Sequence, residues 1–151
     1  MATTYSSLYS ANSDGSGTYA YRGPYGSRAG ETVTVIGSHT ITGSLVTSDL
    51  ANLFPLPAGA KLIRYSHWYE DHGAPVTATI QAGTTDMKAS IALGTAVTEA
   101  NQTSLSDAEL GAGNAAATSA EKIINIDFTS VTTPTSGAKY YFVATYGMPN
   151  G

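Results

Sequence analysis

Residues 61–81 of the chain read KLIRYSHWYEDHGAPVTATIQ. In the second half of this stretch, Val76, Ala78 and Ile80 alternate with polar residues, which predicts a strand with one buried face. The stretch before it is rich in aromatic and β-branched residues and predicts a second strand. Residues 71–75 lie between the two runs and predict a hairpin loop that pairs them. Two paired strands therefore form the starting point of the predicted fold.

The first of these strands, residues 61–70, carries large side chains on both faces. Leu62 and Trp68 share one face, and Ile63, Tyr65 and Tyr69 share the other. Neither face is purely apolar, but aromatic residues on both faces are typical of a strand that is covered on each side. The cover is either a second sheet or another subunit.

Further strands are predicted over residues 33–36, 40–42, 87–92, 122–128 and 140–146, with a turn at Gly37–Ser38. Helical spacing predicts one short helical turn over residues 48–54, and a brief helix over 105–110 that is capped by Ser104 or Ser106. Residues 111–119 predict a loop of small residues. Six to eight short strands with little helix predict an all-β fold, an antiparallel β-sandwich in the general or the jelly-roll form.

The first 32 residues differ from the rest in composition. They contain five tyrosines and five glycines, but no valine or isoleucine before Val33, so they cannot build a core. We interpret residues 1–32 as an extended, irregular N-terminal arm and residues 33–151 as the sandwich body. The arm is either a solvated tail or, because tyrosine suits binding surfaces, a segment that docks on a neighbour. The residues predicted to make these contacts are Tyr5, Tyr9, Tyr19, Tyr21, Arg22, Tyr25 and Arg28.

Charge and cysteine content narrow the classes of partner. Charged residues make up 12% of the chain, the net charge is −4, and the few basic residues form no stripe. This argues against binding to nucleic acid. There is no cysteine, so the fold cannot depend on disulfides. No apolar run is long enough for a spanning helix, and the first residues lack the pattern of a signal peptide. We therefore expect no membrane partner and synthesis in the cytoplasm.

No catalytic constellation is apparent, so we expect neither an enzyme nor a cofactor. The acids are not placed as a recognisable pair, and no nucleophile elbow accompanies the serines. The cluster HWYEDH, residues 67–72, is the one place where metal ligands gather, but His67 and Glu70 would point to opposite faces of a strand. Residues 12–17 imitate the first half of a calcium loop, yet Gly23 stands where its last ligand belongs. We expect no metal site.

One segment resembles a known class of proteins. Residues 56–63 read LPAGAKLI, residues 70–73 form an acidic turn with glycine, and residues 76–83 alternate as VTATIQAG. Residues 85–87 and 91–96 continue the pattern. This succession resembles small virion proteins of tailed bacteriophages, of the head decoration or cement type. The resemblance covers about residues 56–100 and leaves the arm outside.

The resemblance implies a non-enzymatic structural protein of the phage virion. Such a protein would bind the exterior of the capsid, contact the major capsid protein and bridge its subunits as a homo-oligomer, with a trimer as the expected form. Two alternatives stay open: a glycan-binding β-sandwich, and an adhesion module of a head fibre or tail. For the glycan alternative, or for a protein interface, the predicted platform consists of Tyr65, Trp68 and Tyr69.

Overall fold

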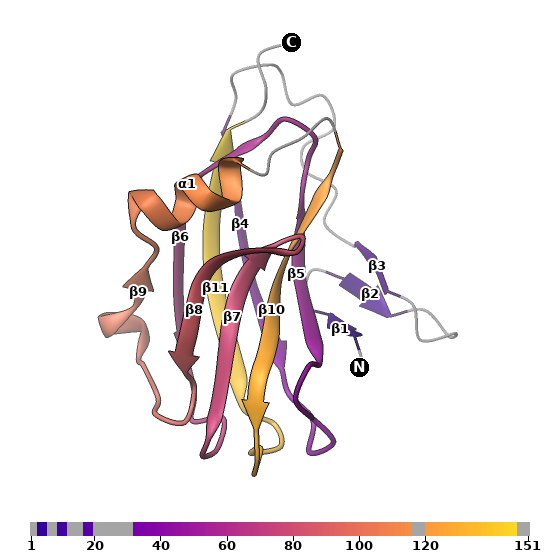
Figure 1. Cartoon of the computed structure of the whole chain (residues 1–151), viewed down its shortest axis with the longest axis vertical. Helices are drawn as coiled ribbons and strands as arrows, with labels where there is room; N and C mark the ends of the chain where they lie inside the picture. Colours follow the sequence, from indigo (N-terminus) through magenta and orange to yellow (C-terminus); the bar gives the residue numbers. More distant parts are fainter. Residues whose placement is uncertain (1–2, 6–8, 12–16, 20–31, 116–119, 148–151) are drawn as a thin grey trace.

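The computed structural model describes residues 3–5, 9–11, 17–19, 32–115 and 120–147. Two sheets face each other (Figure 1), which confirms the predicted β-sandwich. One sheet has the order β1 (Thr3–Tyr5), β5 (Leu50–Leu56), β10 (Lys122–Val131), β7 (Val76–Ala82) and β8 (Thr85–Ala92). The other has the order β4 (Thr32–Thr40), β11 (Lys139–Gly147), β6 (Lys61–Tyr69) and β9 (Thr103–Ser104). Within both sheets every pairing is antiparallel except that of β1 with β5.

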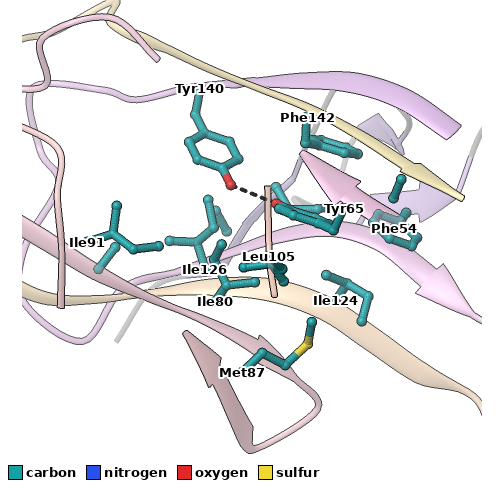
Figure 2. Close-up of a cluster of buried hydrophobic side chains, with 14 of the residues drawn as sticks. Phe54, Tyr65, Ile80, Met87, Ile91, Leu105, Ile124, Ile126, Tyr140 and Phe142 are labelled. Atoms are coloured by element: carbon teal, nitrogen blue, oxygen red, sulfur yellow. Dashed lines mark hydrogen bonds between the residues drawn. The ribbon is translucent and has the colours of Figure 1, made fainter. Parts of the chain in front are cut away.

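Aromatic rings fill much of the core between the sheets. The ring of Phe142 stacks on Phe54 of the opposite sheet, with 5.6 Å between centroids, and on Tyr65 of the neighbouring strand, with 6.4 Å. Figure 2 shows these rings together with Ile80 and Ile126 of the five-stranded sheet. Burial of one such side chain contributes about 1.5–3 kcal/mol, so these contacts hold the sheets face to face.

β6 is confirmed as a strand, and it contains a β-bulge at Ile63. The register with β11 shifts at this point. Leu62 is buried before the bulge, whereas Tyr65, His67 and Tyr69 are buried after it. Because a bulge changes which positions face inward, the large side chains of β6 divide between two faces.

The helical turn predicted over residues 48–54 is wrong, because this segment forms β5. The register with β10 shifts between Asn52 and Phe54, and both Leu53 and Phe54 are fully buried. A bulge brings consecutive side chains to the same side of a strand. The resulting spacing of Leu50, Leu53 and Phe54 imitates that of a helix.

The turn predicted at Gly37–Ser38 is also wrong. Both residues lie inside β4, which runs unbroken from Thr32 to Thr40. All nine residues of β4 pair with β11 in a single register. The β-branched runs on either side of the glycine therefore belong to one strand.

The predicted hairpin between β6 and β7 does not form, because the two strands lie in different sheets. Residues 70–75 cross from one sheet to the other. At the crossing His72 is fully buried, and its backbone N–H donates to the carbonyl of Leu93 at 2.9 Å. Gly73 has a φ of 97°, and its Cα packs so closely on the backbone of Thr133 that a Cβ would overlap it. His72 is thus part of the interior, although it lies in a polar loop.

The helix predicted over residues 105–110 is confirmed in place, as α1 (Asp107–Ala115). Ser106, rather than Ser104, caps it. The Ser106 N–H donates to Oε2 of Glu109 at 2.7 Å, and the Glu109 N–H donates to Oγ of Ser106 at 3.3 Å. This reciprocal pair is a capping box. A single 3₁₀ turn, η1 (Glu99–Asn101), precedes the helix.

The loop predicted over residues 111–119 is helical as far as Ala115, and residues 116–119 lie outside the described residues. Gly113 allows α1 to pack closely on Met87 of β8. Asn114 connects α1 to β6, because its side chain accepts a hydrogen bond from the Leu62 N–H and donates one to the Leu62 carbonyl. α1 therefore links the two sheets (Figure 1). Neither described helix is long and apolar enough to cross a bilayer.

The N-terminal arm contains three short strands, so the prediction that it is wholly irregular is wrong in part. β1 pairs with the edge of β5, and β2 (Tyr9–Ala11) pairs with β3 (Gly17–Tyr19) as a separate ribbon. Residues 6–8, 12–16 and 20–31 lie outside the described residues. The division of the chain at residue 32 stays a prediction.

Candidate interaction surfaces

The sole tryptophan lies on the outer face of the four-stranded sheet. Trp68 of β6 is directly opposite Tyr141 of β11, and their rings stack with 5.5 Å between centroids and an interplanar angle of 10°. Both side chains are half-buried. Rings with an apolar body and a polar edge are typical of binding surfaces.

Ile36 extends this surface onto β4. It is 66% exposed and lies opposite Val143 of β11. The charged residues of β4, β6 and β11 are all basic, namely Lys61, Arg64 and Lys139. We define the outer face by Ile36, Trp68, Tyr141 and Val143. It combines exposed apolar area with few ions, as the centres of protein interfaces do.

The predicted platform of three aromatic residues is divided between two faces. Tyr65 and Tyr69 are buried in the core, where they contact the rings of Phe142 and Tyr140 on the adjacent strand β11. Trp68 alone faces outward. Tyr65 and Tyr69 are therefore not part of any surface platform in this structure.

β4 forms an edge that lacks the usual protection against pairing with other chains. It has neither a charged residue nor a proline, and no strand in the described part of the chain pairs with its other side. Four other pairings in the sandwich contain register shifts, but the ladder of β4 with β11 contains none. Charges, prolines and bulges are the features that discourage added strands, so β4 extends the outer face to an open edge.

A second surface is the place where β1 meets the body. The hydroxyl of Thr4 donates to the carbonyl of Leu50 at 3.0 Å, and it lies 2.8 Å from Nε2 of His39. Because the one hydroxyl proton of Thr4 is committed to Leu50, the His39 Nε2–H must be the donor in the second bond. Thr4 thus connects the N-terminal strand to both sheets.

His39 is held neutral at this site. Its side chain is 2% exposed, and burial lowers its pKa to about 4, with a smaller contribution from nearby His72. Its Nδ1 has no hydrogen-bond partner among the described residues. Protonation would place a buried N–H there without an acceptor, which is costly. The contact with Thr4 therefore uses one defined tautomer.

A polar network lies in the core rather than at a surface. The Tyr140 hydroxyl lies 2.7 Å from that of Tyr65 (Figure 2) and 3.0 Å from Nδ1 of His67. Burial raises the pKa of both tyrosines and lowers the pKa of His67 to about 4. All three groups are neutral near pH 7 and hold the packing of β6 on β11.

The residues of the HWYEDH cluster are separated in the structure. His67 lies in the core, His72 lies under the crossing, and the Glu70 carboxylate accepts a hydrogen bond from the Lys139 N–H at 2.9 Å. Among the described residues, no group of three or more His, Asp or Glu side chains is arranged to hold a metal ion.

The predicted arm contacts are only partly within the described residues. Tyr5, Tyr9 and Tyr19 belong to β1, β2 and β3. The remaining four, namely Tyr21, Arg22, Tyr25 and Arg28, lie outside the described residues. The binding role of all seven stays a prediction.

Sequence reasoning missed Ile36, Tyr141, Thr4 and His39. His39 continues the inward alternation of Val33 and Val35, and this pattern is a signal for a buried histidine. Tyr141 and Ile36 become notable only beside Trp68, through pairings between distant parts of the chain. Nothing in the sequence singles out Thr4.

No protein-family model and no curated protein matches the chain. Its structure is similar to a chain in the capsid of Ralstonia phage GP4, with a TM-score of 0.68, 11% identity, and coverage of 87% of this chain and 93% of that one. The chain shares its fold with chains of phage capsids. A chain of the cyanophage Pam1 capsid asymmetric unit gives a TM-score of 0.55, 20% identity, and coverage of 85% and 93%. Each comparison therefore covers nearly all of the neighbouring chain and most of this one.

Proposed function

We propose that the protein is a non-enzymatic structural component of a phage virion. In this proposal it binds the capsid exterior as a decoration or cement protein and bridges subunits of the major capsid protein, as a homo-oligomer and in the expected form a trimer. The observation that carries the proposal is the shared fold over 87% of the chain with a chain of the Ralstonia phage GP4 capsid.

The strand order supports the same conclusion. From β4 onward, the two sheets have the orders β4-β11-β6-β9 and β5-β10-β7-β8. Apart from β7 and β8, successive strands alternate between the sheets. We infer that this arrangement is an eight-stranded jelly roll, an architecture used by viral capsid domains.

The surface supports a role in assembly. The outer face is apolar at Ile36 and Trp68, and few long charged side chains would have to be desolvated on binding. Extended arms cover a large area per residue, and repeated contacts on a lattice offset the entropy lost when an arm becomes ordered. We assign the arm to contacts with neighbouring subunits and the outer face to the capsid surface.

Co-sedimentation with the native capsid tests the role of the arm. The full chain is expected to pellet with capsids, and a variant without residues 1–31 is expected to stay in the supernatant. The truncation keeps every strand from β4 onward, and circular dichroism checks that the body is folded. Normal capsid occupancy by the truncated protein would contradict the arm's role, and failure of the full chain to bind would contradict the proposal as a whole.

A pair of lysine substitutions tests the outer face in the same assay. Ile36→Lys places a charge in the proposed interface and is expected to weaken binding about tenfold or more. Val46→Lys is the matched control, because Val46 is 54% exposed but lies in the loop between β4 and β5. Equal effects of the two substitutions would exclude the outer face as the contact.

Glycan binding is a second candidate, either by itself or as part of a fibre or tail adhesin. The observation that favours it is the Trp68–Tyr141 stack, because sugar rings pack on partly exposed aromatic rings. A glycan array with the full chain and a Trp68→Ala variant tests it. Glycan binding requires that the full chain binds a glycan on the array and that the Trp68→Ala variant does not.

A further inference from the structure

We propose that in the assembled protein β1 is exchanged between copies, so that residues 3–5 of one copy occupy the β5 edge of a neighbour. In the single chain the strand lies on its own β5 (Figure 1). The inference rests on the proposed function only in requiring that copies assemble side by side.

The position that β1 occupies is a defined binding site. The three residues pair in register with Leu50, Ala51 and Asn52. Thr4 adds the two side-chain contacts described above, to the Leu50 carbonyl and to His39. Strand addition of this kind derives affinity from the backbone and specificity from a side-chain contact. An identical strand from a second copy would make the same contacts.

The connection between strand and body does not force the strand onto its own copy. Twenty-six residues, 6–31, separate β1 from β4, and residues 20–31 alone can extend to about 40 Å. This length is comparable to the diameter of a compact domain of this size, about 40 Å from its expected radius of gyration. The pairing is parallel, so no tight turn joins the paired strands. A long connection gives β1 an effective concentration at its own β5 edge that is in the millimolar range at most. The β1 strand of a neighbouring copy in an oligomer reaches the same range at that edge.

The β5 edge also needs a permanent cover. The bulge and the proline of β5 lie beyond Leu50, Ala51 and Asn52, the part of the edge that β1 covers. This part has no charged residue, so it would pair with other chains if it were left open. If each copy gives its β1 strand to the next copy, every β5 edge stays covered and no hydrogen bond between β1 and β5 is lost. Such head-to-tail exchange closes into a ring when the rotation between copies permits it, as in a trimer.

Cysteine cross-linking tests the exchange, and the chain has no native cysteine to interfere. The Cα atoms of Tyr5 and Asn52 are direct partners in the ladder, within the range that a disulfide spans. A Tyr5→Cys chain is mixed with an Asn52→Cys chain, unfolded, refolded together and oxidised. Exchange predicts a disulfide-linked pair that contains one chain of each kind. The double variant is expected to give covalent multimers on a non-reducing gel.

One control and one alternative cysteine pair complete the cross-linking experiment. Ala92→Cys replaces Asn52→Cys to measure random collision, since Ala92 is exposed on β8 at the far edge of the same sheet. Thr3→Cys with Leu50→Cys provides a second directly opposed pair in case the first impairs folding. A double variant that oxidises fully but stays a single-chain species would overturn the exchange, as would equal yields with Ala92→Cys.

The hydroxyl of Thr4 provides an independent check. Thr4→Val removes both side-chain hydrogen bonds and is expected to lower the yield of the mixed disulfide several-fold, whereas Thr4→Ser retains the hydroxyl and should preserve it. Equal yields from both variants would exclude the His39 contact as part of the site. Because cross-linking needs no capsid, its outcome is independent of the sedimentation assay.

Discussion

Tyr140 connects two other polar side chains in the core between the sheets. Its hydroxyl lies within hydrogen-bond distance of both Tyr65 and His67. Buried networks of this kind favour one packing arrangement, because any shift leaves polar groups unsatisfied. Tyr65 and His67 lie on β6 and Tyr140 on β11, so the network helps to fix the register of these two strands.

Replacing Tyr140 by phenylalanine removes the shared hydroxyl and leaves Tyr65 and His67 without that partner. We expect the free energy of unfolding to fall by about 1–3 kcal/mol, as measured by urea denaturation. Tyr141→Phe is the control, since its ring lies on the outer face, and its effect should stay within about 0.5 kcal/mol. Equal losses for the two variants would show that the network does not stabilise the fold.

The buried histidines predict a loss of stability in mild acid. The pKa values of His39 and His67 are each lowered to about 4 from an ordinary value of 6.5. Between these values the unfolded chain binds protons that the folded chain does not, so the free energy of unfolding decreases as pH falls from 6.5 to about 4 and then levels off. Each histidine accounts for at most about 3 kcal/mol.

Thermal unfolding at several pH values checks this prediction. Replacing both His39 and His67 with glutamine should reduce the slope of the free energy of unfolding between pH 6.5 and 4, even if it lowers stability at pH 7. Part of the slope should remain, because burial also lowers the pKa of His72. A slope that is unchanged by the substitutions would assign the acid sensitivity to other groups.

At the scale of elements, the crossing between β6 and β7 depends on one glycine. Gly73→Ala combines left-handed backbone strain of about 1–2 kcal/mol with a steric overlap on the Thr133 backbone that costs about 1–3 kcal/mol. We expect a total loss near 3 kcal/mol or more by urea denaturation. Gly137 is the control, because its φ is 87° but a Cβ there would meet no atom within 4 Å. Its substitution should cost only the strain.

Local alternation was enough to predict β7, β8 and β10, because the inward face of a strand repeats every second residue, and aromatic and β-branched composition was enough to predict β6 and β11. β5 escaped detection, since its bulge makes Leu53 and Phe54 both point inward. Alternation along β6 also places Trp68 on the face opposite to Tyr65 and Tyr69. Only the burial of these side chains in the structure shows which of the two faces is the outer one. A bulge therefore explains the error at β5, but not the turn wrongly predicted within β4, whose register with β11 is unbroken.

For the whole molecule, the sequence predicted a sandwich but not the partners of each strand. Residues 71–75 are short and polar enough for a hairpin, yet β6 pairs with β11 and β7 with β10. These pairings depend on contacts between distant residues, which no local pattern encodes. The outer face was missed for the same reason, because Trp68 meets Tyr141 only through the β6–β11 pairing.

Low charge predicts that stability depends little on salt. In the described part of the chain one ion pair is present, between Lys88 and Glu109 at 3.5 Å, and both side chains are partly exposed. Such pairs contribute about 0–1 kcal/mol. Raising sodium chloride from about 0.05 M to about 0.5 M should therefore change the free energy of unfolding by less than about 0.5 kcal/mol. A larger shift in urea titrations would point to electrostatic interactions beyond this pair.

The position of the single tryptophan gives the protein a built-in optical probe. Trp68 is half-buried on the outer face, so its emission responds to water at that surface. A partner that covers the face would remove this water, shift the emission to shorter wavelength and reduce quenching by acrylamide. Docking on this surface can thus be followed in real time with the unlabelled protein.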